Sequence, residues 1–351
     1  VGLISEDGFE ARSGVISDVA HITVLCAGKP SVWPTFLGAP ASGHDFFRLS
    51  CNTGAVALRF EKLPPYTTPV PVTPWRWIVG TIVVLVAWLV GGTILGLLLL
   101  PYTGINPQVL VMGGDVLSEM PAWGFLFFAL VTFLPFFLGT LVAYRFILGL
   151  KLRYLFASVG RFRWWRVGLG FWVWLLLIGA PVVAGIVSNP GAYRFEPDWQ
   201  TFIPFVVIGI LLFPVQTTAE ELFFRGWIIQ WAARGWSNIW WLSTLSGVLF
   251  AIPHLLNPEA AGDVAGAFFG YFTIGFALAW VTVRDRSLEI AIGAHLSNNL
   301  FAALVVGYEG GALPPEALFV TDPIEWGASN LLGVILVPLF ILLTRFGRPK
   351  A

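Results

Sequence analysis

From Trp75 onward, long runs of apolar residues alternate with short polar segments. A helix rises about 1.5 Å per residue, so about 20 apolar residues cross a hydrocarbon layer of about 30 Å. The fifth and seventh runs are marginal by hydropathy, because each contains a histidine. The pattern predicts an all-α, polytopic transmembrane helix bundle of about eight spans, at residues 76–100, 122–147, 167–188, 201–232, 239–256, 265–283, 289–307 and 327–345.

The composition agrees with a membrane protein. Of the 351 residues, 57% are hydrophobic and only 11% are charged, whereas ordinary soluble domains contain about 25% charged residues. A soluble domain could not bury so much apolar surface, so we expect an integral, multi-pass protein of a bacterial-type plasma membrane, surrounded by the lipid bilayer. The formal net charge of zero argues against a nucleic-acid partner.

The charges between the predicted spans indicate an orientation. If the N-terminus is cytosolic, the connections at 101–121, 189–200, 257–264 and 308–326 face outward, and Arg194 is their one basic residue. Cytosolic loops are enriched in Lys and Arg, so this distribution predicts eight crossings with both termini in the cytosol. The outward connections contain the acidic residues Asp115, Glu119, Glu196, Asp198, Glu259, Asp263, Glu309, Glu316, Asp322 and Glu325. The inner connections and the tail contain Arg145, Lys151, Arg153, Arg161, Arg163, Arg166, Arg234, Arg284, Arg286, Arg345, Arg348 and Lys350.

Four parts follow from this reading of the chain. Residues 1–73 form a polar N-terminal extension that ends in a proline-rich linker, and disorder is one interpretation of it. No positively charged start precedes an apolar core there, so a secretory signal is not expected. Residues 74–200 contain the first three spans, and 201–307 contain the spans with polar residues at depth. Residues 308–351 contain an outer loop, the last span and a basic cytosolic tail.

Several polar side chains lie inside the predicted spans, where each ionised group costs about 2.5–3.5 kcal/mol on insertion scales and usually marks a functional interior. Glu221 and Arg225 are four residues apart, a spacing suited to a salt bridge on one helix face. Glu220 projects about 100° away from Glu221 and remains for another role. His295 and Asn299 also share one helix face.

These residues form three motifs in order, each on a separate predicted span. The motifs are Glu-Glu-x-x-x-Arg at 220–225, Phe-x-x-x-His at 250–254 and His-x-x-x-Asn at 295–299. With all three present, the chain resembles the CPBP intramembrane proteases, a family that includes CAAX-processing and bacteriocin-processing endopeptidases. The resemblance covers about residues 200–305, which would then be the catalytic core.

The resemblance implies hydrolysis of peptide bonds inside the membrane, with a protein or peptide as substrate. Glu220 would be the general base that activates water, and His254 would help to hold that water. His295 and Asn299 would donate hydrogen bonds to the oxyanion of the tetrahedral intermediate. Supporting roles would fall to Glu221, Arg225 and Phe250.

A metal ion is an open question for this site. The family is commonly labelled as metalloproteases, and Glu220, His254 and His295 are candidate Zn²⁺ ligands. No His-Glu-x-x-His motif is present, however, and a glutamate–histidine pair could activate water by itself. We therefore expect no obligatory metal.

Other classes of function are compatible with polar residues in a membrane. The three motifs could form a structural polar network in a non-catalytic immunity or scaffold protein that kept the fold. Buried Glu and His residues also serve as proton relays, so a proton-coupled transporter is another alternative, although no inverted repeat is evident. The substrate is equally open, since a CAAX-like lipidated protein, a secreted peptide precursor or another membrane protein would all suit the site.

Overall fold

The computed structural model describes residues 71–106, 108, 119–158 and 161–345, together with the backbone of two strands nearer the N-terminus. The chain divides into two compact units, Val1–Pro64 with Pro349–Ala351, and Pro65–Arg348. In the first unit, strand β1 (Val19–Cys26) pairs with strand β2 (Val56–Lys62) in an antiparallel ladder. Residues 1–18, 27–55 and 63–70 of the N-terminal extension, which include most of its proline-rich linker, and the basic residues Arg348 and Lys350 lie outside the described residues.

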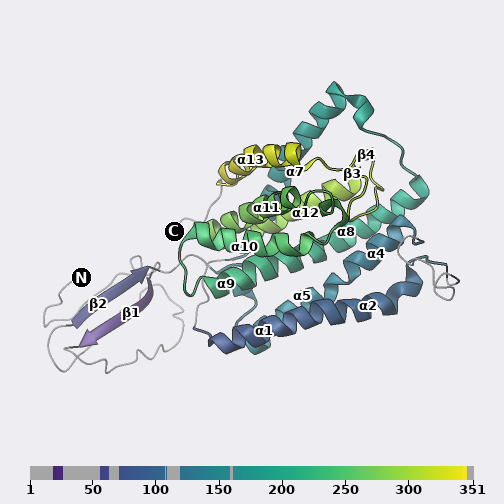
Figure 1. The fold of residues 1–351 in the computed structure, drawn as a ribbon. Helices are drawn as coiled ribbons and strands as arrows, with labels where there is room; N and C mark the ends of the chain where they lie inside the picture. The colour runs from purple at the N-terminus through teal and green to yellow at the C-terminus, as the bar shows by residue number, and fades with distance from the viewer. Residues whose placement is uncertain are drawn as a thin grey trace. The chain divides into compact units, whose positions relative to one another are not determined.

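The second unit is a helix bundle (Figure 1). Each predicted span coincides with a helical segment, and the described residues include two short strands near the end of the unit. The segments are α1 (Pro74–Val86) with η2 (Ala87–Gly91), α2 (Gly92–Leu99) and η3 (Leu100–Tyr102); α4 (Ala122–Val131), α5 (Phe133–Val142) and η4 (Ala143–Ile147); α6 (Arg153–Phe156); α7 (Trp164–Ser188) and η5 (Pro190–Ala192); α8 (Trp199–Glu221), η6 (Leu222–Trp227) and α9 (Ile228–Ala232); α10 (Ile239–His254) and η7 (Pro258–Ala260); α11 (Val264–Asp285); α12 (Glu289–Leu300) and η8 (Phe301–Val305); β3 (Val306–Tyr308) and β4 (Phe319–Thr321); and α13 (Trp326–Leu343).

Within the described part of the chain, six helical segments are long and apolar enough to cross a membrane: Pro74–Tyr102, Ala122–Ile147, Trp164–Ser188, Trp199–Ala232, Val264–Asp285 and Trp326–Leu343. The other two predicted spans are shorter. α10 has 16 residues, and α12 has 12 residues that η8 continues for another five. A helix of 16 residues is only about 24 Å long. These are the two spans whose histidines made them marginal in the sequence, and both contribute to the site described below.

The surface of the bundle is apolar, as expected for an integral, multi-pass membrane protein. Leu98, Leu176 and Val187 are 68%, 69% and 78% exposed, respectively, on three different turns of the outer helices. The interior is more polar than a soluble core, because Glu221 and Arg225 are fully buried. Apolar side chains therefore face outward and ionisable groups face inward, which suits surroundings of lipid.

Helix α8 runs through the middle of the bundle, between α4 and α5 on one side and α12 on the other (Figure 1). Glycines let the neighbouring helices approach closely. A Cβ at Gly293 of α12 would lie 1.9 Å from the carbonyl oxygen of Val167 on α7, and a Cβ at Gly275 of α11 would lie 3.0 Å from Cα of Gly247 on α10. Small residues are typical of helix contacts in membranes. Here they bring α12 close to α7 and α10 close to α11.

Candidate active site

Glu220 and Glu221 lie at the end of α8, where the helix passes into the π-helical turn η6. Such turns are frequent at functional sites, because they change the direction of side chains within one helix. Glu220 is 5% exposed and Glu221 is fully buried. The two carboxylates therefore lie inside the bundle, where each needs a polar partner.

The predicted salt bridge between Glu221 and Arg225 is present. The Nη1 atom of Arg225 donates to Oε1 of Glu221 over 2.9 Å, and both side chains are fully buried. The guanidinium also donates to the carbonyl oxygen of Gly275 on α11 and lies 4.3 Å from the centre of the Phe250 ring. Arg225 thus joins α8, α10 and α11, and neutralises one of the two adjacent acids.

His295 lies between the two carboxylates. Its Nδ1 is 2.7 Å from Oε1 of Glu221, and its Nε2 is 3.4 Å from Oε2 of Glu220. Because a carboxylate can only accept, Nδ1 carries the hydrogen of the contact with Glu221. Oε2 of Glu220 is buried and has no hydrogen-bond partner among the described residues.

His254 ends helix α10 and takes its orientation from the preceding turn. Its Nδ1 is 2.7 Å from the carbonyl oxygen of Phe250, which can only accept, so Nδ1 carries a hydrogen and Nε2 is the free acceptor of the neutral ring. The Phe250 ring lies 4.5 Å from the His254 ring and 5.6 Å from the His295 ring, measured between ring centres. Phe250 therefore separates the two histidines, and also lies against Arg225.

A chain of amide side chains leads to Glu220 from the opposite direction. Nε2 of Gln216 donates to Oε1 of Glu220 over 2.7 Å, and Nδ2 of Asn299 donates to Oε1 of Gln216 over 2.9 Å. Nδ2 of Asn298 donates to Oδ1 of Asn299 over 3.2 Å, and the indole of Trp174 donates to Oδ1 of Asn298 over 3.2 Å. Each group fixes the next, and the chain ends on one oxygen of Glu220.

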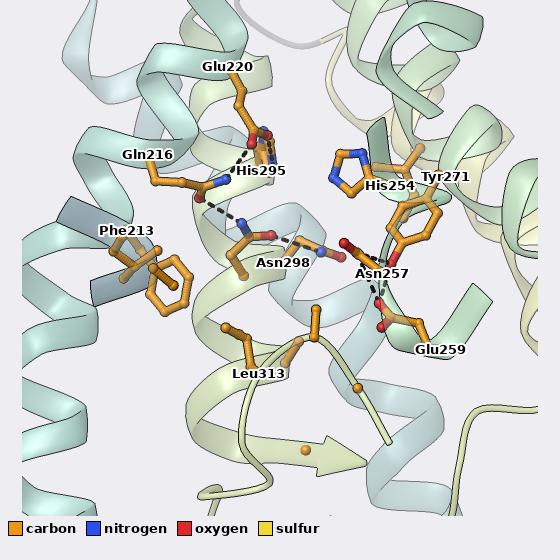
Figure 2. A pocket seen from close by; sticks show the side chains of 18 of the residues that line it. Phe213, Gln216, Glu220, His254, Asn257, Glu259, Tyr271, His295, Asn298 and Leu313 are labelled. Carbon is orange, nitrogen blue, oxygen red and sulfur yellow. Dashed lines mark hydrogen bonds and ion pairs between the residues drawn. The ribbon is translucent and has the colours of Figure 1, made fainter. Parts of the chain in front are cut away.

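These groups line a cavity with a volume of about 350 Å³. Figure 2 shows Gln216, Glu220 and His295 on one side of it, with His254, Asn257 and Tyr271 opposite and the loop that carries Leu313 near its end. The polar lining comes from α8, α10, α11, α12, β3 and the connection that contains η7, and apolar side chains such as Phe213 complete the wall. The arrangement can hold a small polar molecule beside a carboxylate, next to room for a peptide segment.

Residues 199–301 match the family model for "Type II CAAX prenyl endopeptidase Rce1-like" proteins, and all three motifs fall inside that range. These residues form an Rce1-like domain. The chain is also 29% identical over 269 residues to the uncharacterized protein YyaK of Bacillus subtilis (strain 168), which covers 76% of this chain and 90% of YyaK. The resemblance that the three motifs indicate is thereby confirmed for residues 199–301, and the matching family is one of CAAX-type endopeptidases.

The Rce1-like domain brings its sequence-predicted residues to one cavity. Glu220, Phe250, His254, His295 and Asn299 all line it, whereas Glu221 and Arg225 lie directly behind it. Asn299 uses its amide on Gln216, so the observed contact gives it a part in orienting Glu220, and its role towards an oxyanion stays a prediction.

Two residues of the amide chain were not recognised from the sequence. Gln216 precedes Glu220 by four residues and so shares its helix face, a spacing that could have identified it. Asn298 neighbours Asn299, but the contact with Trp174 on α7 has no signal in the sequence.

The expectation that no metal is obligatory stays a prediction. Among the residues that the structure describes, no three His, Cys, Asp or Glu side chains are grouped so that they could hold an ion. Nδ1 of His295 contacts Glu221 and Nδ1 of His254 contacts a backbone carbonyl, which leaves Nε2 of each ring for other contacts. Histidines that bind a metal often use their second ring nitrogen in the same way.

Proposed function

We propose that this chain is an intramembrane endopeptidase that cleaves a membrane-associated or lipidated (CAAX-like) protein or peptide precursor, with Glu220 as general base. The proposal rests above all on Oε2 of Glu220, a buried carboxylate oxygen beside a cavity that has no hydrogen-bond partner among the described residues. Leaving such an atom unsatisfied costs about 1–3 kcal/mol, and more when it is charged. A water molecule bound there would remove this cost and would be placed for activation.

Water would be held between an acceptor and the base. The free Nε2 of His254 faces the same cavity and can accept one hydrogen of the water, while Glu220 takes the proton of the other O–H bond. The water oxygen then attacks the carbonyl carbon of the scissile bond. Gln216 holds the other oxygen of Glu220, so the base cannot rotate away from the water.

His295 would stabilise the oxyanion of the tetrahedral intermediate. Because Nδ1 donates to Glu221, Nε2 can donate as well only when the ring is an imidazolium. The proton on Glu220 finally passes to the amide nitrogen, the C–N bond breaks, and an amine and a carboxylic acid leave.

An apolar groove supports a substrate associated with the membrane. It has a volume of about 700 Å³ and is lined almost entirely by apolar side chains of α1, η2, η6, α9 and α10, among them Trp88, Phe223, Phe224 and Leu249. Phe223 and Phe224 follow Glu220 by three and four residues. An acyl or isoprenoid chain would pack against these side chains by van der Waals contact.

The test is the Glu220→Gln variant, which keeps the shape of the side chain and removes the base. We expect turnover to fall by about 10²–10⁴-fold, the usual contribution of a general base, with an unchanged thermal unfolding midpoint. In cells, the uncut precursor should accumulate, and comparison of the membrane and secreted peptides of wild-type and variant cells would identify it.

Glu325→Gln is the matched control, because Glu325 is exposed and precedes α13 outside the cavity. A scaffold or immunity protein would keep its phenotype in the Glu220→Gln variant. A proton-coupled transporter would instead show substrate or ion flux in liposomes. A retained phenotype or such a flux would overturn the proposal that this chain is a protease.

A further inference from the structure

A second carboxylate lines the cavity at the end opposite Glu220. Glu259 belongs to the short helix η7 in the connection between α10 and α11, and it lies beside Asn257, Tyr271 and Tyr308 (Figure 2). Neither the three motifs nor the proposed reaction uses any of these four residues. They come from three different elements, so the cluster exists only in the folded chain.

One oxygen of Glu259 is saturated and the other is not. Oε1 accepts hydrogen bonds from the hydroxyl of Tyr271 over 2.5 Å, from Nδ2 of Asn257 over 3.2 Å and from the hydroxyl of Tyr308 over 3.3 Å. Burial, together with the Glu259 carboxylate, raises the pKa of Tyr308 above its usual range, so this hydroxyl keeps its proton. Oε2 is buried and has no hydrogen-bond partner among the described residues. Donors therefore fix the carboxylate and leave one acceptor open.

The charge of Glu259 is not compensated in the way that the charge of Glu220 is. Glu220 lies beside His295 and next to the Arg225–Glu221 pair, whereas Glu259 forms no ion pair with any described residue. The described residues that line the cavity include two glutamates and no lysine or arginine. A partly buried carboxylate without a counter-charge attracts a cation strongly, because water screens it little.

We propose that Glu259, fixed by Asn257, Tyr271 and Tyr308, is a subsite for a cationic group of the substrate. The group is an ammonium or guanidinium, carried by a Lys or Arg side chain or by the N-terminus, and it binds to Oε2 of Glu259 while the scissile bond lies beside Glu220. This deepens the proposed function and rests on it.

The first experiment measures cleavage by the purified full-length protein in lipid nanodiscs. A mixture of peptides with free or acetylated N-termini is digested, and the cut sites are identified by mass spectrometry. We expect either enrichment of Lys and Arg at one fixed position from the scissile bond or a preference for peptides with free N-termini. The first result would assign the positive charge to a side chain, and the second would assign it to the N-terminus. For the preferred peptide, replacing Lys with norleucine or acetylating the N-terminus should lower kcat/KM by about tenfold or more, as for a lost hydrogen bond to a charged group.

In the Glu259→Gln variant, the ratio of kcat/KM for the cationic peptide to kcat/KM for its neutral twin should fall to about one. Glu325→Gln, an exposed carboxylate outside the cavity, should keep the full preference. The subsite would be overturned by equal preferences in wild type and Glu259→Gln, or by cut sites with neither enrichment of Lys and Arg nor a preference for free N-termini. The proposed protease activity would be unaffected by either result.

The second experiment does not need turnover. Binding of a fluorescent lysine-containing peptide amide and of its acetyl-lysine twin is compared in Glu220→Gln and in the Glu220→Gln, Glu259→Gln double variant. We expect tighter binding of the lysine peptide, by about tenfold, in the single variant only. If the wild-type protein cleaves neither peptide but this difference in binding is present, the cation subsite is supported and the proposed protease activity is wrong.

If Glu259→Gln does not fold, the variants Tyr271→Phe and Tyr308→Phe replace it, because each removes a hydrogen bond that holds the carboxylate. Each should reduce the preference for the lysine peptide. An unchanged preference in both variants would overturn the cation subsite.

Discussion

Glu220 and Glu221 are adjacent in the chain but have different surroundings. Successive helical residues point about 100° apart, so Glu221 faces Arg225 while Glu220 faces Gln216 and the cavity. His295 contacts both acids with its two ring nitrogens. At this scale, the decisive property of each residue is which polar atom lacks a hydrogen bond: Oε2 of Glu220, 3.4 Å from Nε2 of His295, accepts none from the described residues.

The amide chain gives a prediction at the residue scale. Gln216→Met preserves the volume of the side chain but removes the donor that holds Glu220, so we expect kcat to fall by about tenfold, with little change in KM. A hydrogen bond to a charged group contributes about 1.5–3 kcal/mol, and 1.36 kcal/mol corresponds to a tenfold change in rate. Steady-state kinetics with a defined peptide would measure both parameters.

Gln230→Met is the control, because Gln230 is also a buried glutamine but hydrogen-bonds Tyr144 and the carbonyl of Tyr154 away from the cavity. It should reduce stability and leave kcat of the folded protein unchanged. If both variants lowered kcat equally, a positioning role for Gln216 would be wrong.

Helix α12 shows how an element delivers two site residues. Its first turn is held by ion pairs of Glu289 with Arg163 and Arg166, which lie at and before the start of α7. One turn later, Gly293 lies against the backbone of α7, and His295 follows on the next turn. The basic loop before α7, which the sequence presents as a determinant of topology, therefore also anchors α12.

At the element scale, Gly293→Ala should separate α12 from α7. The new Cβ would lie 1.9 Å from the carbonyl oxygen of Val167, so the backbone must shift, and overpacking of this kind costs about 1–3 kcal/mol. We expect a lower thermal unfolding midpoint and a loss of turnover, because His295 moves with the helix.

Gly168→Ala is the control variant. Gly168 lies on α7 one residue beyond Val167, and a Cβ at this position would meet nothing within 4 Å. This variant should be neutral or slightly more stable, because alanine favours a helix over glycine. Equal unfolding midpoints for the two variants would contradict the close contact.

For the whole molecule, the acidic and basic connections predict which end of the bundle faces the cytosol. Gly235 lies in the connection between α9 and α10, and Gly262 in the connection between α10 and α11, so the two glycines are at opposite ends of α10. Both are exposed, and a Cβ at either would meet nothing within 4 Å. Each can therefore carry a cysteine without disturbing the fold.

In a variant without Cys26 and Cys51, a membrane-impermeant maleimide added to intact cells should label Gly262→Cys but not Gly235→Cys. Permeabilised cells should show label at both. The reverse pattern would mean that the positive-inside rule misassigns this chain. With the expected result, the end of the cavity that contains Glu259 lies at the outer side.

The sequence by itself determined the helices, the residues with polar groups at depth and the pairs that share a helix face, such as Glu221 with Arg225. These features depend on rise and rotation per residue, which are the same in every helix. Only the tertiary structure decided that His295 lies between two carboxylates, that Asn299 reaches Glu220 through Gln216, and that Glu259 shares the cavity. Distances between helices depend on where glycines allow close approach and on which side chains fill the gaps, and no periodicity within one helix contains that information.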